Sequence, residues 1–296
     1  AKVMMCKANV SEGRRKDALE EMAAAVRAVD GVTLADWSGD PDHNRAVFTL
    51  LGTPDDVLEG AMALTREALD RIDMTTHEGE HPRMGAVDVV PFIPLREVET
   101  EEAVEVARRF GAWLGERGVP VYYYEDAATR PERVSLPKIR KGQYEALPEK
   151  LADEEWTPDE GPAEFNPRAG ATVVGARFPL VAFNVNLRTT DLEIAQTIAR
   201  NVRHINGGYR FVRGMGFALE DKGMVQVSMN LVNYEKTPIH RVLETIRSEA
   251  DRYGVQIAGT ELIGSVPLGA LEEVVRFYLQ THDFTTEQVV ETALLD

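Results

Sequence analysis

The sequence contains one cysteine, Cys6, among 296 residues. A single thiol excludes an intrachain disulfide and any zinc site built on several cysteines. Cys6 stands in the apolar run VMMC, which is typical of a buried strand residue rather than a nucleophile. A transmembrane helix needs about 20 consecutive apolar residues, and no apolar run in this sequence is that long. The start of the chain has no signal-peptide pattern. We therefore expect a soluble, cytoplasmic protein with no membrane partner.

Positive charge is scarce as well. The chain has 33 Lys and Arg against 49 Asp and Glu, a formal net charge of −16. Nucleic acids and anionic membranes bind basic surfaces, so neither is an expected partner. An anionic small molecule would have to be bound by local arginines. The phosphate-binding G-x-x-x-x-G-K-[ST] loop and the G-x-S-x-G nucleophile elbow are both absent.

The spacing of apolar residues predicts one order of strands and helices twice, each time β-α-β-β-α-β, the plan of ferredoxin-like domains. An extra helix and strand follow the first set, at 100–117 and 119–124. The sequence thus predicts an α/β (α+β) protein of two ferredoxin-like subdomains, 1–170 and 171–296, with a ligand cleft or tunnel between them. The first set is expected at 2–8, 14–29, 32–36, 46–51, 57–72 and 86–94; the second at 180–187, 191–203, 211–220, 224–231, 238–253 and 255–263, with a last helix at 268–279.

Residues 127–170 differ in character from the rest of the chain. They are rich in proline and charge and show little apolar periodicity. Long segments without strong elements in compact proteins are usually functional loops or linkers. We expect this one to serve both roles.

One stretch, 73–94, combines polar chemistry with a following apolar strand. It contains His77-Glu78-Gly79-Glu80-His81, which matches the H-E-x-x-H pattern of zinc proteases. That motif needs a helix, whereas Gly79 weakens a helix and Pro82 moves His81 out of the α region. The pattern therefore indicates a loop. Three interpretations stay open at this point: a zinc site, two solvated histidines, or a proton-carrying His81 held in a loop before a strand.

Several longer blocks carry a resemblance to a known family. They are NVSEGR near the start, DHNR at 42–45, GEHPRMGAVDVVPFIP at 79–94, VPVYYYEDAA, GPAEFNPRAGATVVGAR at 161–177, AFNVNL at 182–187 and QVSMNL at 226–231. In register over almost the whole chain, they resemble glutamate formimidoyltransferases. The resemblance implies transfer of the formimino group of N-formimino-L-glutamate to tetrahydrofolate in histidine degradation, by two α/β subdomains with a folate tunnel between them. It further implies a homodimer, no metal, and no fused cyclodeaminase activity.

The resemblance also implies site residues. The histidine of GEHPRMG, here His81, would be the catalytic acid/base. Because a guanidinium fork matches a carboxylate, Arg45, Arg83 and Arg168 are candidates for binding the carboxylates of substrate and folate. The folate-contacting segment falls on Gly161, Pro162, Ala163, Glu164, Phe165, Asn166, Pro167, Arg168, Ala169 and Gly170, and the substrate-binding candidates are Asn9, Arg45, Arg83, Asn184 and Asn186.

Two positions depart from the family pattern. Ala8-Asn9-Val10 replaces the PNF of PNFSEG, and Ser38 stands where family members often have the second acid of D-x-D-S-D. A lost acid near the cleft leaves two alternatives open. One is formyl transfer between 5-formyltetrahydrofolate and glutamate, and the other is a folate-binding carrier without catalysis.

Overall fold

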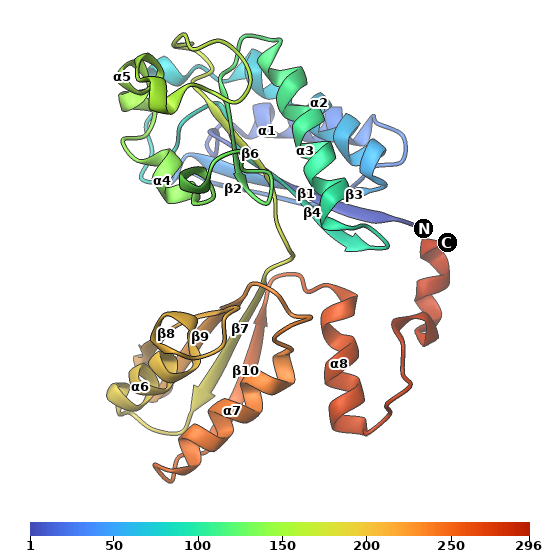
Figure 1. Cartoon of the computed structure of the whole chain (residues 1–296), viewed down its shortest axis with the longest axis vertical. Coiled ribbons are helices and arrows are strands. Elements are labelled where there is room, and N and C mark those ends of the chain that lie inside the picture. Colours follow the sequence, from blue (N-terminus) through green and yellow to red (C-terminus); the bar gives the residue numbers. More distant parts are fainter. The chain divides into compact units, whose positions relative to one another are not determined.

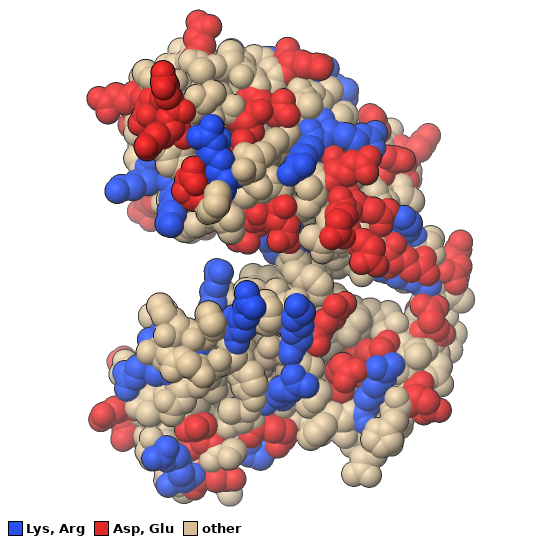
Figure 2. Space-filling view, in the orientation of Figure 1, with Lys and Arg blue, Asp and Glu red and all other residues tan.

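The computed structural model describes residues 1–296 and divides the chain into two compact units, Ala1–Arg177 and Phe178–Asp296 (Figure 1). Each unit has its own sheet, with six strands in the first and four in the second. Acidic side chains are spread over the visible surface of both units, as the net charge of −16 requires (Figure 2). No helix is long and apolar enough to span a bilayer.

The first unit contains the expected β-α-β-β-α-β set. Its four strands pair antiparallel in the order β2-β3-β1-β4. Two further strands extend the sheet, because β6 pairs parallel with both β4 and β5. The strands are β1 (Val3–Val10), β2 (Thr33–Asp40), β3 (Arg45–Gly52), β4 (Val87–Arg96), β5 (Val121–Glu125) and β6 (Thr172–Ala176).

Three helices pack against this sheet, namely α1 (Lys16–Arg27), α2 (Pro54–Arg71) and α3 (Thr100–Gly115). Each buries the apolar stripe that its sequence spacing predicts, as Leu19, Met22 and Val26 do in α1. The start of α2 follows its sequence signal, since Thr53 caps the helix through Asp56 N and Pro54 is the first helical residue. Helices and strands share one large core.

The segment 127–170 is a packed part of the first unit and does not link the two units. It contains α4 (Leu136–Arg140) and α5 (Leu147–Ala152). Ile139, Leu147 and Leu151 form a second core with Tyr122 and Tyr124 of β5. Because β5 and β6 are neighbours in the sheet, the chain returns from this segment to the first sheet. The linker role expected from the sequence was wrong, since apolar periodicity over two short helices is too brief to recognise.

The same pairing changes where the second unit begins. The sequence pattern predicts a second subdomain from residue 171 and does not predict β6. Thr172–Ala176 instead pairs with β4 and β5, and all five of its residues are buried. The second unit begins at Phe178. A short, fully buried parallel strand shows no alternation of polar and apolar residues, so the sequence of β6 does not indicate which sheet it joins.

The second unit repeats the ferredoxin-like strand order, β10-β7-β9-β8, with every pair antiparallel. In β7 the apolar Phe183 and Val185 belong to the core, whereas Asn184 and Asn186 alternate with them. The elements are β7 (Val181–Leu187), α6 (Leu192–Val202), β8 (Val212–Leu219), β9 (Met224–Leu231), α7 (Ile239–Asp251), β10 (Ile257–Ile263) and α8 (Leu268–Leu279). The prediction of two α/β subdomains is confirmed.

Candidate functional site

The residues of the H-E-x-x-H match form an irregular loop between a short 3-10 helix (Met74–Thr76) and β4. The loop lies close to the turn before β3. Glu80 N donates to Asp42 O at 3.1 Å, and a Cβ on Gly79 would lie 2.3 Å from the carbonyl oxygen of His43. A side chain at position 79 would therefore push the two segments apart. The loop predicted from Gly79 and Pro82 is confirmed, and the helix that a zinc protease motif needs is not formed.

His81 presents one free ring nitrogen. Its Nδ1 lies 2.7 Å from the carbonyl oxygen of Pro82. A carbonyl only accepts hydrogen bonds, so Nδ1 carries the proton in the neutral ring and Nε2 carries the lone pair. Nε2 has no hydrogen-bond partner within the chain. The ring of His43 stands beside it, with centroids 5.4 Å apart.

The pKa of His81 is lowered from its ordinary value, chiefly because burial disfavours the imidazolium. The hydrogen bond to Pro82 acts in the opposite direction, while the positive charges of Arg45 and Arg140 lower the pKa further. Asp88 raises it again. The balance keeps the ring neutral near pH 7, so Nε2 is available as a base.

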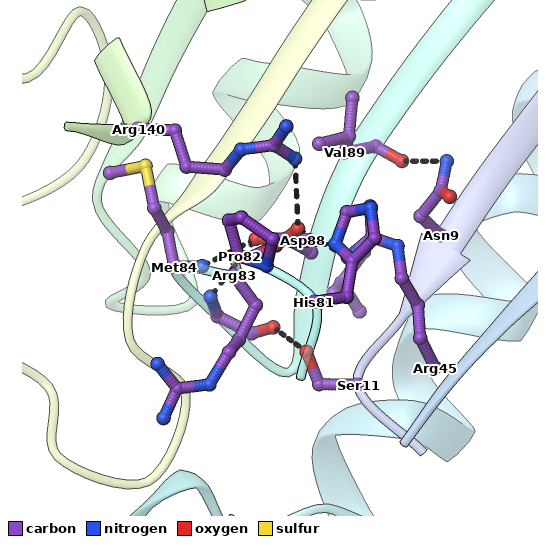
Figure 3. A network of polar contacts seen from close by, with 12 residues as sticks. Asn9, Ser11, Arg45, His81, Pro82, Arg83, Met84, Asp88, Val89 and Arg140 are labelled. Atoms are coloured by element: carbon purple, nitrogen blue, oxygen red, sulfur yellow. Dashed lines mark hydrogen bonds and ion pairs between the residues drawn. The ribbon is translucent and has the colours of Figure 1, made fainter. Parts of the chain in front are cut away.

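Asp88 binds backbone amides of the histidine loop and lies near two arginines beside His81. It is fully buried at the start of β4, and its Oδ1 accepts hydrogen bonds from Met84 N at 2.6 Å and Gly85 N at 3.3 Å. Its Oδ2 lies 2.5 Å from Nη1 of Arg45 and 3.9 Å from Nη1 of Arg140. Two guanidinium groups thus converge on one carboxylate beside His81 (Figure 3).

Strand β1 and the residue that follows it supply two polar side chains to the same place. Asn9 donates through Nδ2 to Lys7 O at 3.1 Å and to Val89 O at 3.4 Å, which leaves its Oδ1 as a free acceptor. Ser11 is buried and donates to Gly85 O at 2.7 Å, so it fastens the histidine loop to the end of β1. Of the residues expected in the site, Asn9, Arg45 and His81 lie together (Figure 3).

Arg83 and His77 form a separate network. Arg83 Nε donates to His77 Nδ1 at 3.1 Å, and its two terminal nitrogens bind Glu145 at 2.8 and 2.9 Å. His77 Nε2 in turn donates to Asn44 O at 2.9 Å. Both nitrogens of His77 are therefore in use, and the guanidinium of Arg83 points away from His81 (Figure 3). No group of three or more His, Cys, Asp or Glu side chains is placed to hold a metal ion.

The segment 161–170 is exposed at its start and anchored at its end. Asn166 donates to Gly118 O at 3.1 Å, and Tyr144 donates through its hydroxyl to Pro167 O at 2.6 Å. Arg168 donates to Asp70 O at 2.6 Å. Gly161 has a φ of +80°, and a Cβ there would lie 2.5 Å from Val119 O, so only glycine fits. Residues 161–164 are exposed and available to a ligand.

Asn184 and Asn186 belong to the second unit. They donate to the carboxylate of Glu261 in β10, at 3.4 and 3.3 Å, and Gln226 donates to Asn186 Oδ1 at 2.9 Å. Hydrogen bonds lower the pKa of Glu261, and the one from Asn186 has a larger effect than the one from Asn184. His81, Asn9, Arg45, Asp88 and Arg140 all belong to the first unit.

Sequence reasoning missed two residues next to His81. The sequence does mark Asp88, because it is the single acidic residue inside the apolar run AVDVVPFI. Buried carboxylates need partners, so such an acid predicts an ion pair. Arg140 carried no such signal, because it lies in the segment 127–170, where the apolar periodicity was too weak to predict an element.

Comparisons with known proteins agree with the motifs. Residues 3–177 match the family model described as "Formiminotransferase domain, N-terminal subdomain", and residues 182–294 match "Formiminotransferase domain". The chain is 48% identical to the glutamate formimidoyltransferase of Streptococcus pyogenes serotype M1, covering 100% of this chain and 99% of that one. It is 45% identical to the enzyme of the same name from Thermoplasma acidophilum, over 97% and 95% of the two chains.

A third relative is longer. The formimidoyltransferase-cyclodeaminase of Mus musculus is 46% identical over 94% of this chain, which spans 52% of that protein. The family resemblance read from the motifs is confirmed by these full-length matches. The chain belongs to the formiminotransferase family.

Proposed function

We propose that this protein is a glutamate formimidoyltransferase. It transfers the formimino group of N-formimino-L-glutamate to tetrahydrofolate, giving 5-formimidoyltetrahydrofolate and L-glutamate, a one-carbon transfer in histidine degradation. Similarity over whole chains to two enzymes of that name supports the activity. The observation in the structure that carries the proposal is the free Nε2 of His81, held in a defined tautomer by Pro82.

The reaction needs two proton transfers at one place. The amine at ring position five of the pterin attacks the formimino carbon, and a tetrahedral intermediate forms. A proton must leave the attacking nitrogen, and a proton must reach the glutamate nitrogen as its bond to carbon breaks. Nε2 of His81 accepts the first and donates the second, so the ring ends the cycle neutral. The free Oδ1 of Asn9 lies on the same side and can accept a hydrogen bond from the attacking amine.

Substrate binding is proposed from position and charge. Arg45 lies next to His81 and takes a carboxylate of the donor, while the exposed part of the segment Gly161–Gly170 contacts folate. Asn184 and Asn186 of the second unit are proposed as further substrate-binding residues. Arg83 fits a different role from the one expected, since its donors are already bound to Glu145 and His77. The protein is proposed to act without a metal, in the cytoplasm, as a homodimer.

The test is a transfer assay with purified protein. Formiminoglutamate and tetrahydrofolate are mixed with the protein, and both the new folate absorbance and free glutamate are followed. Equimolar formation of both products supports the proposal. Transfer only from 5-formyltetrahydrofolate to glutamate would favour the formyl alternative. Tight tetrahydrofolate binding without any product would favour the carrier alternative.

A further inference from the structure

The site beside His81 holds more positive charge than its acid can neutralise. Asp88 is the carboxylate shared by Arg45 and Arg140, and each of its oxygens is already committed. Oδ1 accepts from Met84 N and Gly85 N, and Oδ2 is in contact with Arg45 at 2.5 Å. Arg140 stays 3.9 Å from that oxygen, which is beyond hydrogen-bond distance.

The guanidinium of Arg140 therefore has unused hydrogen-bond donors in a partly buried position. Its side chain is 18% exposed, and its guanidinium makes no hydrogen bond within the chain. Burial lowers the pKa of Arg140, Asp88 acts in the opposite direction, and the nearby Arg45 lowers the pKa further. A guanidinium in such a position is costly unless an anion with matching geometry binds it.

The fold holds Arg140 in place without using its charge. It is the last residue of α4, and the preceding Ile139 is fully buried in the core formed with β5. Its backbone oxygen accepts from Gln143 N at 2.8 Å, which turns the chain after the helix. The guanidinium extends from this anchor to the carboxylate beside His81 (Figure 3).

We propose that Arg140 and Arg45 together bind the α-carboxylate of the formimino donor, and that Arg140 is the residue that makes the enzyme select an α-amino acid derivative. This inference rests on the proposed function. The α-carboxylate is the donor's anion nearest the reacting centre, because it is attached to the carbon that bears the formimino nitrogen. The group that binds it must therefore lie next to the group that moves protons, as Arg140 and Arg45 do. The donor's γ-carboxylate lies two methylene groups further away, and the folate tail lies beyond an aminobenzoyl spacer.

The experiment compares donors and variants. Wild type, Arg140→Gln and Arg140→Lys are assayed with N-formiminoglutamate, its α-amide and its γ-amide. Lys141→Gln is the matched control, because Lys141 is the next residue, is cationic and is exposed. Tetrahydropteroate replaces tetrahydrofolate in a parallel series, which removes the two carboxylates of the folate glutamate and leaves the benzoate carboxylate. Thermal melting of each variant checks folding.

We expect Arg140→Gln to lose the preference for formiminoglutamate over its α-amide. Arg140→Gln should raise KM for formiminoglutamate about 10- to 100-fold, the size of a lost charge-assisted hydrogen-bonded contact. KM for tetrahydrofolate should stay within about twofold of wild type, since that ligand's carboxylates are elsewhere. Wild type should prefer the acid over the α-amide, and the variant should use both about equally. Arg140→Lys should recover part of the preference and Lys141→Gln should keep all of it.

Four outcomes would overturn the inference. An equal loss with acid, α-amide and γ-amide would mean that Arg140 only supports the fold. Loss of discrimination for the γ-amide alone, or for tetrahydropteroate alone, would assign Arg140 to another carboxylate. Unchanged kinetics would leave it no role in binding. Absence of transfer by the wild type would overturn the proposed function itself, and this inference with it.

Discussion

The imidazole of His81 is hydrogen-bonded to the carbonyl oxygen of the very next residue, Pro82, at 2.7 Å. The contact fixes the ring by a bond that the loop itself provides. It also assigns the proton to Nδ1, so the basic Nε2 is free. Proline at position 82 restricts the backbone on both sides of that bond, because its own φ is fixed and the residue before it is kept extended. The proline that excluded a zinc helix in the sequence is thus part of what orients His81.

Replacing His81 should remove turnover without removing folate binding. His81→Ala takes away the group that carries both protons, and we expect kcat to fall by about 100-fold or more. Tetrahydrofolate affinity, measured by fluorescence titration, should change little because the substitution leaves the proposed folate-contacting segment, 161–170, intact. His77→Gln is the matched control, because it removes the other histidine of the loop. A loss of kcat in His77→Gln as large as in His81→Ala, with both proteins folded, would contradict the assignment.

The pH dependence of the reaction should follow the lowered pKa of His81. The ring must be neutral to accept the first proton, so activity is full above its pKa and is lost as pH falls through it. Because burial and two arginines lower that pKa, the acid limb of kcat/KM should lie below the ordinary histidine value of about 6.5. Arg140→Gln removes one of those charges, so its acid limb should move to higher pH. An unmoved limb would mean that a group other than His81 titrates there.

Much of this architecture is predictable from local pattern. The apolar spacing of α1 and α2 and the alternation in β7 predicted both ferredoxin-like sets, because those elements bury one face and expose the other. The pattern fails where burial is complete. β6 is buried at every residue, and α4 is only one turn long, so neither has a periodicity to detect.

The site was predictable to the same degree. Gly79 and Pro82 correctly indicated a loop, and the family motif selected His81. The partner of Arg45 and the position of Arg140 depend on how α4 folds back over the sheet, which is a long-range contact. The contacts of Arg83 also depend on a residue distant in sequence. Its charge and position favoured a ligand role, but Glu145, distant in sequence, uses its guanidinium.

Asp88 should be a major contributor to the stability of the first unit. Asp88→Asn leaves Arg45 largely buried without its counter-ion, and breaking a buried ion pair on one side costs about 3–5 kcal/mol. Asp55→Asn is the matched control, because Asp55 is 80% exposed and pairs with Arg109, and exposed pairs contribute about 1 kcal/mol or less. Denaturant unfolding measures both. Equal small shifts of the two midpoints, with unchanged slopes, would show that the Asp88 pair is not buried in solution.

Arg133 should hold the segment 127–170 on the sheet, and with it Arg140. Its guanidinium is buried, lies 5.1 Å from the ring centroid of Tyr122 and 5.6 Å from that of Trp156, and pairs with Asp159 at 3.1 Å. Arg133→Met removes that pair and leaves a buried carboxylate, a loss of about 3–5 kcal/mol.

The expected signs of Arg133→Met are faster proteolysis within 127–170, altered Trp156 fluorescence and a raised KM for formiminoglutamate, because Arg140 loses its anchor. Arg130→Met is the control. Arg130 is exposed, and its one side-chain contact is a hydrogen bond to Glu155 O at 3.1 Å, so its loss should leave all three readouts close to wild type. If Arg133→Met unfolds the segment while KM stays unchanged, Arg140 does not bind the donor. If Arg133→Met changes neither the proteolysis of the segment nor KM, the second core is stable without its buried arginine.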